Sequence, residues 1–219
     1  MRQWFRALIL PVVVCLPPVA FADARVLDRS VAMVNGQVMT WSELDFEARV
    51  LLIYAGGTEA RSAPLDFHVL RDSRDELITH RLLARAAEAL VAYPLDEGEL
   101  EAAVKRFKMR FETQATWQAF LDRHETDETG VTLTLARFLR AQHVLDGKLR
   151  LKAQVSESEA KRWVEEHPEL AELPLTAVRQ KLFADRFRSL AKGEVRQARK
   201  NARVRLLGPF AGGADGGAS

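Results

Sequence analysis

The chain has 219 residues, of which 47% are hydrophobic and 28% charged, and its formal net charge is +2. This length is enough for one large or two small domains, and the nearly neutral charge gives no general reason to expect a nucleic-acid-binding protein. The only cysteine is Cys15, which excludes a disulfide within the chain.

Residues 1–22 have the pattern of a secretory signal peptide. Arg2 and Arg6 precede an apolar stretch, which ends at the cleavage-type sequence Ala20-Phe21-Ala22. A retained membrane anchor is the alternative, but the stretch is shorter than the roughly 20 residues that span a bilayer, and prolines interrupt it. We therefore predict export to the periplasm, with a mature chain that begins at Asp23, contains no cysteine and carries no net charge.

The first structural signal of the mature chain is a hairpin that leads into a helix. Asn35-Gly36 tolerates the positive φ angles of a tight turn, and it separates two apolar runs, Val31–Val34 and Val38–Met39. Thr40 and Glu43 form a capping-box pattern, which predicts that a helix begins directly after the second strand.

The remainder of the chain is predicted to be mainly helical, because its apolar residues recur at helical spacing. Asp96 and Ser156 are predicted N-caps, each followed by a glutamate at the third position. The predicted helices cover about Trp41–Tyr54, Asp66–Ala92, a segment after Asp96 with the apolar stripe Leu100, Val104, Phe107 and Phe111, a short segment around Trp117, Val131–Leu149, a segment from Ser156 to just before Pro168, and Leu175–Ala202. Thr126–Gly130 is predicted to be a turn, and Val204–Leu207 a short strand.

No pattern typical of catalysis or metal binding stands out in the sequence. The histidines lack companions at ligand spacing, and the motifs of nucleotide binding and of serine nucleophiles do not occur. We therefore expect no catalytic residue, no metal and no cofactor. The histidines considered are His68, His80, His124, His143 and His167.

The predicted last helix and strand are strongly basic. Leu175–Leu206 contains ten Lys or Arg and two acidic residues, a local charge of +8. We expect this helix to dock on the correspondingly acidic remainder of the chain. Contact with anionic lipid or with nucleic acid is the alternative, and the exported location argues against nucleic acid.

The order of these features resembles that of the SurA-type periplasmic chaperones. The export signal, the hairpin, the capped helix at Trp41, the segment Val155–Glu159 leading to Pro168, and the basic helix that runs into Arg203–Leu207 follow one another as in that family. The resemblance covers most of the mature chain. It implies a mainly α chaperone module in which a late strand joins the early hairpin.

One feature of that family is missing from the sequence. Its members usually carry parvulin-type prolyl isomerase domains before the last helix, whereas Pro168 and Pro174 are only six residues apart here. The domains expected are therefore a signal peptide (1–22), a hairpin with a helical chaperone module (23–169), a helix and strand that complete the module (170–208) and a disordered tail (209–219).

The resemblance implies a non-enzymatic, ATP-independent chaperone that holds unfolded exported polypeptides, among them outer-membrane proteins, in an apolar cradle between the amino-terminal helices and the last helix. A prolyl isomerase relative with residual activity and an assembly factor for one partner are the alternatives. We expect no nucleic-acid partner and no stable insertion into a membrane. A homodimer that exchanges the late strand is compatible with the sequence.

Aromatic and methionine residues are the candidates for contact with an unfolded client, because flexible and rigid apolar side chains together suit loose recognition of many sequences. Met109 is the most distinctive, since it falls off the stripe of Phe107 and Phe111. The predicted client-binding residues are Met33, Met39, Trp41, Phe46, Met109, Trp117 and Phe120.

Overall fold

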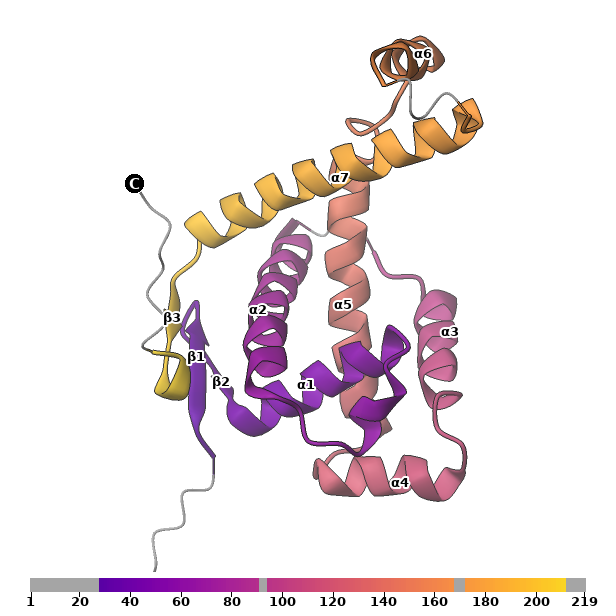
Figure 1. Cartoon of the computed structure of the whole chain (residues 1–219). Helices are drawn as coiled ribbons and strands as arrows, with labels where there is room; N and C mark the ends of the chain where they lie inside the picture. Colours follow the sequence, from indigo (N-terminus) through magenta and orange to yellow (C-terminus); the bar gives the residue numbers. More distant parts are fainter. Residues whose placement is uncertain (1–27, 91–93, 168–171, 212–219) are drawn as a thin grey trace, which may run out of the picture.

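The computed structural model of the protein describes residues 28–90, 94–167 and 172–211 (Figure 1). These residues form a mainly helical fold with one small sheet, as the sequence predicts. The elements are β1 (Ser30–Val34), β2 (Gln37–Thr40), α1 (Trp41–Tyr54), the 3-10 turn η1 (Thr58–Arg61), α2 (Phe67–Leu90), α3 (Glu97–Lys108), α4 (Gln114–Arg123), α5 (Glu128–Leu149), α6 (Glu157–Glu166), α7 (Leu175–Lys200), β3 (Val204–Leu206) and the 3-10 turn η3 (Gly208–Phe210).

The sheet has the order β2-β1-β3, and both pairs of strands are antiparallel. Asn35 and Gly36 adopt φ angles of 50° and 87°, so the predicted tight turn is confirmed. Asn35 also ties the hairpin to the end of the chain, because its side chain accepts a hydrogen bond of 2.9 Å from the backbone N–H of Arg203. The late strand thus completes the early hairpin within one chain.

Two clusters of buried side chains form the main core. The first lies where the sheet meets α1 and α2, and it includes Met39, Leu44 and Ile78. The second lies between α1, α3, α4 and α5, and it is rich in aromatic side chains such as Phe107 and Trp117. Helices α2 and α5 lie side by side at the centre, and α7 crosses them at one end (Figure 1).

Helix α6 and the start of α7 form an arm with a small core of its own. Val155, Ala160 and Val178 are buried there, and Trp163 and Phe183 pack around them. Figure 1 shows α6 at the far end of α7, away from α1–α4. The arm therefore depends on contacts within itself, while the second half of α7 packs on α2 and α5.

The residues after β3 close the fold rather than beginning a tail. Phe210 is buried and lies between two other aromatic rings, at 5.9 Å from Trp41 and 5.1 Å from Phe67 between ring centroids. Both pairs are stacked, and the guanidinium of Arg74 lies 4.7 Å from the Phe210 ring centroid. The predicted tail boundary at residue 209 is therefore wrong, because burial of Phe210 depends on rings that are remote in the sequence.

Most predicted helix boundaries agree with the structure within two residues. The exception is α5, which begins at Glu128 rather than Val131 because the Asp127 carboxylate accepts a hydrogen bond from the Gly130 backbone N–H and caps the helix. The predicted turn at Thr126–Gly130 is accordingly shorter than expected. The predicted signal peptide lies outside the described residues.

Candidate functional site

Met109, the candidate that falls off the apolar stripe of α3, is the most exposed of the predicted client-binding residues. Its side chain is 73% exposed, although Phe107 and Phe111 on either side of it are buried. Helix α3 ends at Lys108, so Met109 follows the helix at its carboxyl end. This placement is what the helical spacing of Phe107 and Phe111 predicts for Met109.

Three other candidates are corrected to core residues: Met39, Trp117 and Phe120. Met39 points into the cluster beneath the sheet, and Trp117 and Phe120 lie on the face of α4 that packs against α1, α3 and α5. All three are almost completely buried, so a client cannot reach them without opening the core. The physical reason for Trp117 and Phe120 is that one face of a short amphipathic helix must be buried for the helix to be stable, and for Met39 that one face of the sheet covers the first core cluster.

The other three candidates are partly buried and are not brought together with Met109. Met33 lies in β1, opposite Val38 of β2 and Arg205 of β3. Trp41 packs on the first core cluster and stacks on Phe210, whereas Phe46 packs on the second cluster. These positions indicate structural roles.

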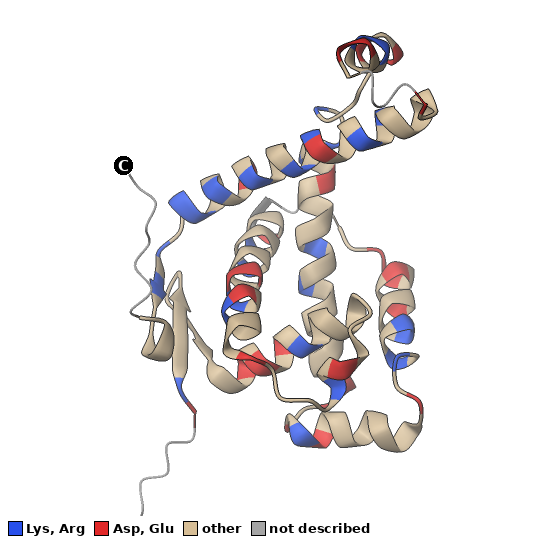
Figure 2. Ribbon diagram, in the orientation of Figure 1, with Lys and Arg blue, Asp and Glu red and all other residues tan. Residues whose placement is uncertain are grey.

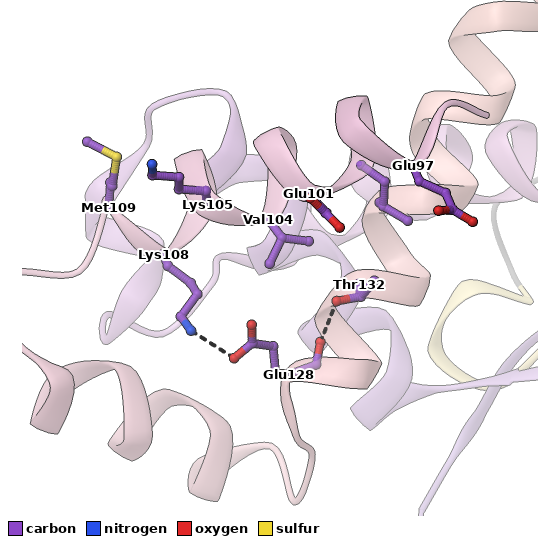
Figure 3. A pocket seen from close by; sticks show the side chains of 9 residues that line it. Glu97, Glu101, Val104, Lys105, Lys108, Met109, Glu128 and Thr132 are labelled. Atoms are coloured by element: carbon purple, nitrogen blue, oxygen red, sulfur yellow. Dashed lines mark hydrogen bonds and ion pairs between the residues drawn. The ribbon is translucent and has the colours of Figure 1, made fainter.

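A groove of about 710 Å³ lies between α3 and the amino-terminal part of α5, and Met109 stands at one end of it (Figure 3). Most of the surface inside this groove is apolar. Figure 3 shows Val104 pointing from α3 toward Glu128 and Thr132 of α5. The lining residues are Glu97, Leu100, Glu101, Val104, Lys105, Lys108, Met109, Glu128 and Thr132.

Charged side chains with long aliphatic stems surround the apolar floor of the α3–α5 groove. Lys108 Nζ pairs with Glu128 Oε2 at 2.8 Å and so bridges the two helices across the groove. Both side chains are substantially exposed, so this pair contributes little to stability and can open at small cost. Lysine stems cover apolar surface while the ammonium stays in water, which makes the groove adaptable in shape.

The position of α3 is set at both of its ends. The Asp96 carboxylate accepts a hydrogen bond of 2.9 Å from the Glu99 backbone N–H, which caps the helix as predicted. Glu99 also pairs with His143 of α5 at 2.9 Å. At the other end Phe107 is buried against Phe111 and Trp117. The groove is therefore formed by helices whose separation is fixed.

A charge cluster around the buried Glu47 lies between α1, α2 and α5 and was not predicted from the sequence; its members are Glu43, Glu47, Arg81 and Arg137. Glu47 is only 3% exposed, and its Oε1 accepts hydrogen bonds from Arg81, at 2.9 Å, and from Arg137. Arg81 also pairs with Glu43 at 2.7 Å. A glutamate on the same helix face as Leu44 and Leu51 was the signal that could have revealed the cluster, since a charge there must be paired.

His80 lies beside this cluster and is held neutral by its surroundings. Burial, together with the nearby guanidinium of Arg137, lowers the pKa of His80 to about 4. Its ring packs edge-on against Phe138, with 5.0 Å between centroids. Glu76 on the same helix lies 3.7 Å away, but it is largely exposed and its attraction does not outweigh burial.

We predict that His80 makes the stability of the protein depend on pH. The unfolded chain binds a proton at His80 below about pH 6.5, whereas the folded chain does so only near pH 4. The free energy of unfolding is therefore highest above about pH 6.5 and decreases as the pH falls below that value. The free energy of unfolding should drop by about 2 kcal/mol between pH 7 and pH 5 on this account. Urea denaturation of His80→Gln should show a much weaker dependence over that range, while His68→Gln, at an exposed position, should keep it. If the free energy of unfolding depended on pH equally in the two variants, the prediction would be contradicted.

Two further histidines, His124 and His167, contact carboxylate, carbonyl and aromatic groups within the fold. His124 Nδ1 lies 3.8 Å from Asp45, and His167 Nδ1 lies 2.9 Å from the carbonyl oxygen of Trp163. Within residues 28–90, 94–167 and 172–211, no three His, Cys, Asp or Glu side chains are grouped as metal ligands would be. The groove on α3 is therefore the site that the arrangement of side chains favours.

Comparison with models of known protein families finds no match to this chain, and comparison with curated proteins finds no significant similarity. Among the described helices, none combines the length and the apolar character needed to cross a bilayer.

Proposed function

We propose that the protein is an ATP-independent chaperone that holds unfolded segments of exported polypeptides in the groove between α3 and α5. The observation that supports this proposal is the exposure of Met109 beside an apolar groove whose floor is formed by Leu100 and Val104. An exposed methionine of this kind costs free energy in water, and an unfolded chain supplies the apolar side chains that would cover it.

The groove suits weak and reversible binding. A groove of this size has room for only a few client side chains at a time. Burial of each apolar side chain contributes on the order of 1.5–3 kcal/mol, and the entropic cost of ordering the client offsets part of that gain. The flexible Met109 and the lysine stems can repack around different side chains. Sequence-independent holding of clients follows from these properties.

The α3–α5 groove is not where the resemblance to the SurA-type chaperones implies that clients bind. The resemblance implies a cradle between the amino-terminal helices and the last helix. A groove does lie between α2 and α7, and its surface is also mainly apolar, although Arg188, Lys192 and Arg196 are among its lining residues. The α3–α5 groove differs from it in having a large exposed apolar side chain, that of Met109, at its end, and this is why we place client binding there.

We predict that Met109→Glu weakens client holding about tenfold, because a charge replaces the apolar side chain at the end of the groove. The measurement is the chaperone concentration that halves the aggregation of a denatured outer-membrane protein on dilution. Leu151→Glu is the matched control: Leu151 is 80% exposed and lies outside the groove, so this variant should act as the native protein does.

Three outcomes would count against the proposal. The native protein could fail to suppress aggregation at several-fold molar excess, or Met109→Glu and Leu151→Glu could lose activity equally. Suppression of one client, with no binding to unrelated unfolded polypeptides, would instead indicate an assembly factor dedicated to that client.

A further inference from the structure

The carboxyl-terminal half of α7 and the strand after it carry a row of basic side chains that the fold leaves unpaired. Lys192, Arg196, Lys200, Arg203 and Arg205 are all exposed, and none of them forms an ion pair within the described part of the chain. We call these five residues the basic ridge. Figure 2 shows Lys and Arg gathered along this end of α7 and at the strand that follows it.

Docking of α7 on an acidic surface does not account for the ridge. Ala198 in the second half of α7 and Ala202 just after the helix pack on the core, and Arg199 pairs with Asp75 of α2 at 3.7 Å. The contact with α5 has the opposite sign, since Glu194 of α7 pairs with Lys148 at 3.0 Å. The helix is thus held by apolar contacts and by ion pairs of both signs, and the five ridge residues take part in none of these pairs.

We propose that the basic ridge docks the protein on the surface of an anionic lipid bilayer. From Lys192 to Lys200 the helix rises about 12 Å, and Arg203 and Arg205 continue the row, so the five charges lie within one or two Debye lengths of one another. Each Lys or Arg near an anionic membrane contributes on the order of 1 kcal/mol, which makes five enough for measurable and salt-sensitive binding.

The composition of the ridge favours a membrane over a protein or nucleic acid as its partner. A protein interface has an apolar or aromatic centre, but none of the large exposed apolar side chains of the described residues belongs to the segment Arg188–Ala211, and Phe67, which touches that segment, is stacked on Phe210. Single-stranded nucleic acid is held by basic grooves that include aromatic rings, and the exposed residues of the ridge are basic alone. A plane of phosphate headgroups needs only exposed positive charge, and α7 crosses α2 and α5 at one end of the fold (Figure 1).

The test is co-sedimentation of the protein with vesicles of phosphatidylcholine alone or with about a quarter phosphatidylglycerol, at low and at high salt. Lys192→Gln/Arg196→Gln/Lys200→Gln should lower the partition constant for the anionic vesicles about a hundredfold. Arg85→Gln/Lys152→Gln/Lys161→Gln removes the same charge from other exposed positions and should lower it less than about threefold. Circular dichroism should show that both variants fold, and both leave the α3–α5 groove untouched, so their activity in the aggregation assay should be unchanged.

Three results would overturn the lipid proposal. The native protein could bind neutral and anionic vesicles equally, or the two triple variants could lose binding to the same extent. Tighter binding of polyglutamate or of single-stranded DNA than of anionic vesicles, lost in the ridge variant, would assign the ridge to a soluble polyanion.

Discussion

Replacement of Glu47 by alanine is expected to lower the free energy of unfolding by about 3 kcal/mol. Glu47 Oε1 is the acceptor shared by Arg81 and Arg137, and Arg81 is itself largely buried. Removal of the carboxylate leaves two guanidinium groups close together with only Glu43 to balance them. This expected loss is at the lower end of the range for removing one partner of a buried ion pair, because Arg137 is partly exposed and can turn toward water.

Urea denaturation of Glu47→Ala measures this loss, and Glu88→Ala is the matched control. Glu88 pairs with Arg140 at 3.2 Å, but both side chains are exposed, so that variant should change stability by less than about 1 kcal/mol. In the double variant Glu47→Ala/Arg137→Ala one unpaired cation is removed, so its loss should be smaller than the sum of the two single losses. Additive losses would show that the carboxylate and the guanidinium do not act as a pair.

The features that could be predicted from the sequence are those fixed by neighbouring residues. Thr40 and Glu43 cap α1 through contacts with each other's backbone, and Asn35-Gly36 forms its turn through its own φ preferences. The start of α5 is a related case. Asp127 supplies an N-cap as Asp96 does, but the third residue after it is Gly130, whereas the third residue after Asp96 is Glu99, so the capping-box pattern that marks the start of α3 is missing at α5.

The features that could not be predicted depend on residues that are far apart in the sequence. The Glu47 cluster needs α2 and α5 to bring arginines to α1, and no spacing within one helix specifies that meeting. Residue type likewise could not separate exposed client-binding candidates from core residues. Trp117 and Phe120 have large apolar side chains, as Met109 does, and only the position of Met109 off the apolar stripe distinguished it from them.

The basic ridge lies between these two cases. Its charge is plain in the sequence, and the contact of α7 with the rest of the chain was expected from it. The structure separates much of the charge from the contact: Ala198, Ala202 and Arg199 contact the rest of the chain, whereas the five ridge residues are exposed and form no ion pair within the described residues. Net charge predicts association with anions, but it does not say whether the anion belongs to the same molecule.

Replacement of Phe210 by alanine is expected to lower the free energy of unfolding by about 3–5 kcal/mol, the largest effect of any single change considered. The ring is 3% exposed and is stacked between Trp41, the first residue of α1, and Phe67, the first residue of α2. Its loss would leave a cavity between two helix ends that the core cannot easily close. A typical domain is stable by only 5–15 kcal/mol, so the variant should unfold at a clearly lower urea concentration.

Three variants separate this packing effect from a general effect on the end of the chain. Phe67→Ala removes the other ring of the same stack, but Phe67 is 43% exposed, so the loss should be about half as large. Pro209→Ala changes an exposed neighbour and should cost less than about 1 kcal/mol. A chain that ends at Leu207 should be destabilised as much as Phe210→Ala, because β3 still pairs with β1 but the aromatic stack is lost. If the shortened chain and Phe210→Ala both unfolded at the native midpoint, the carboxyl-terminal turn would be a passive tail, and the amino-terminal hairpin would be held by strand pairing alone.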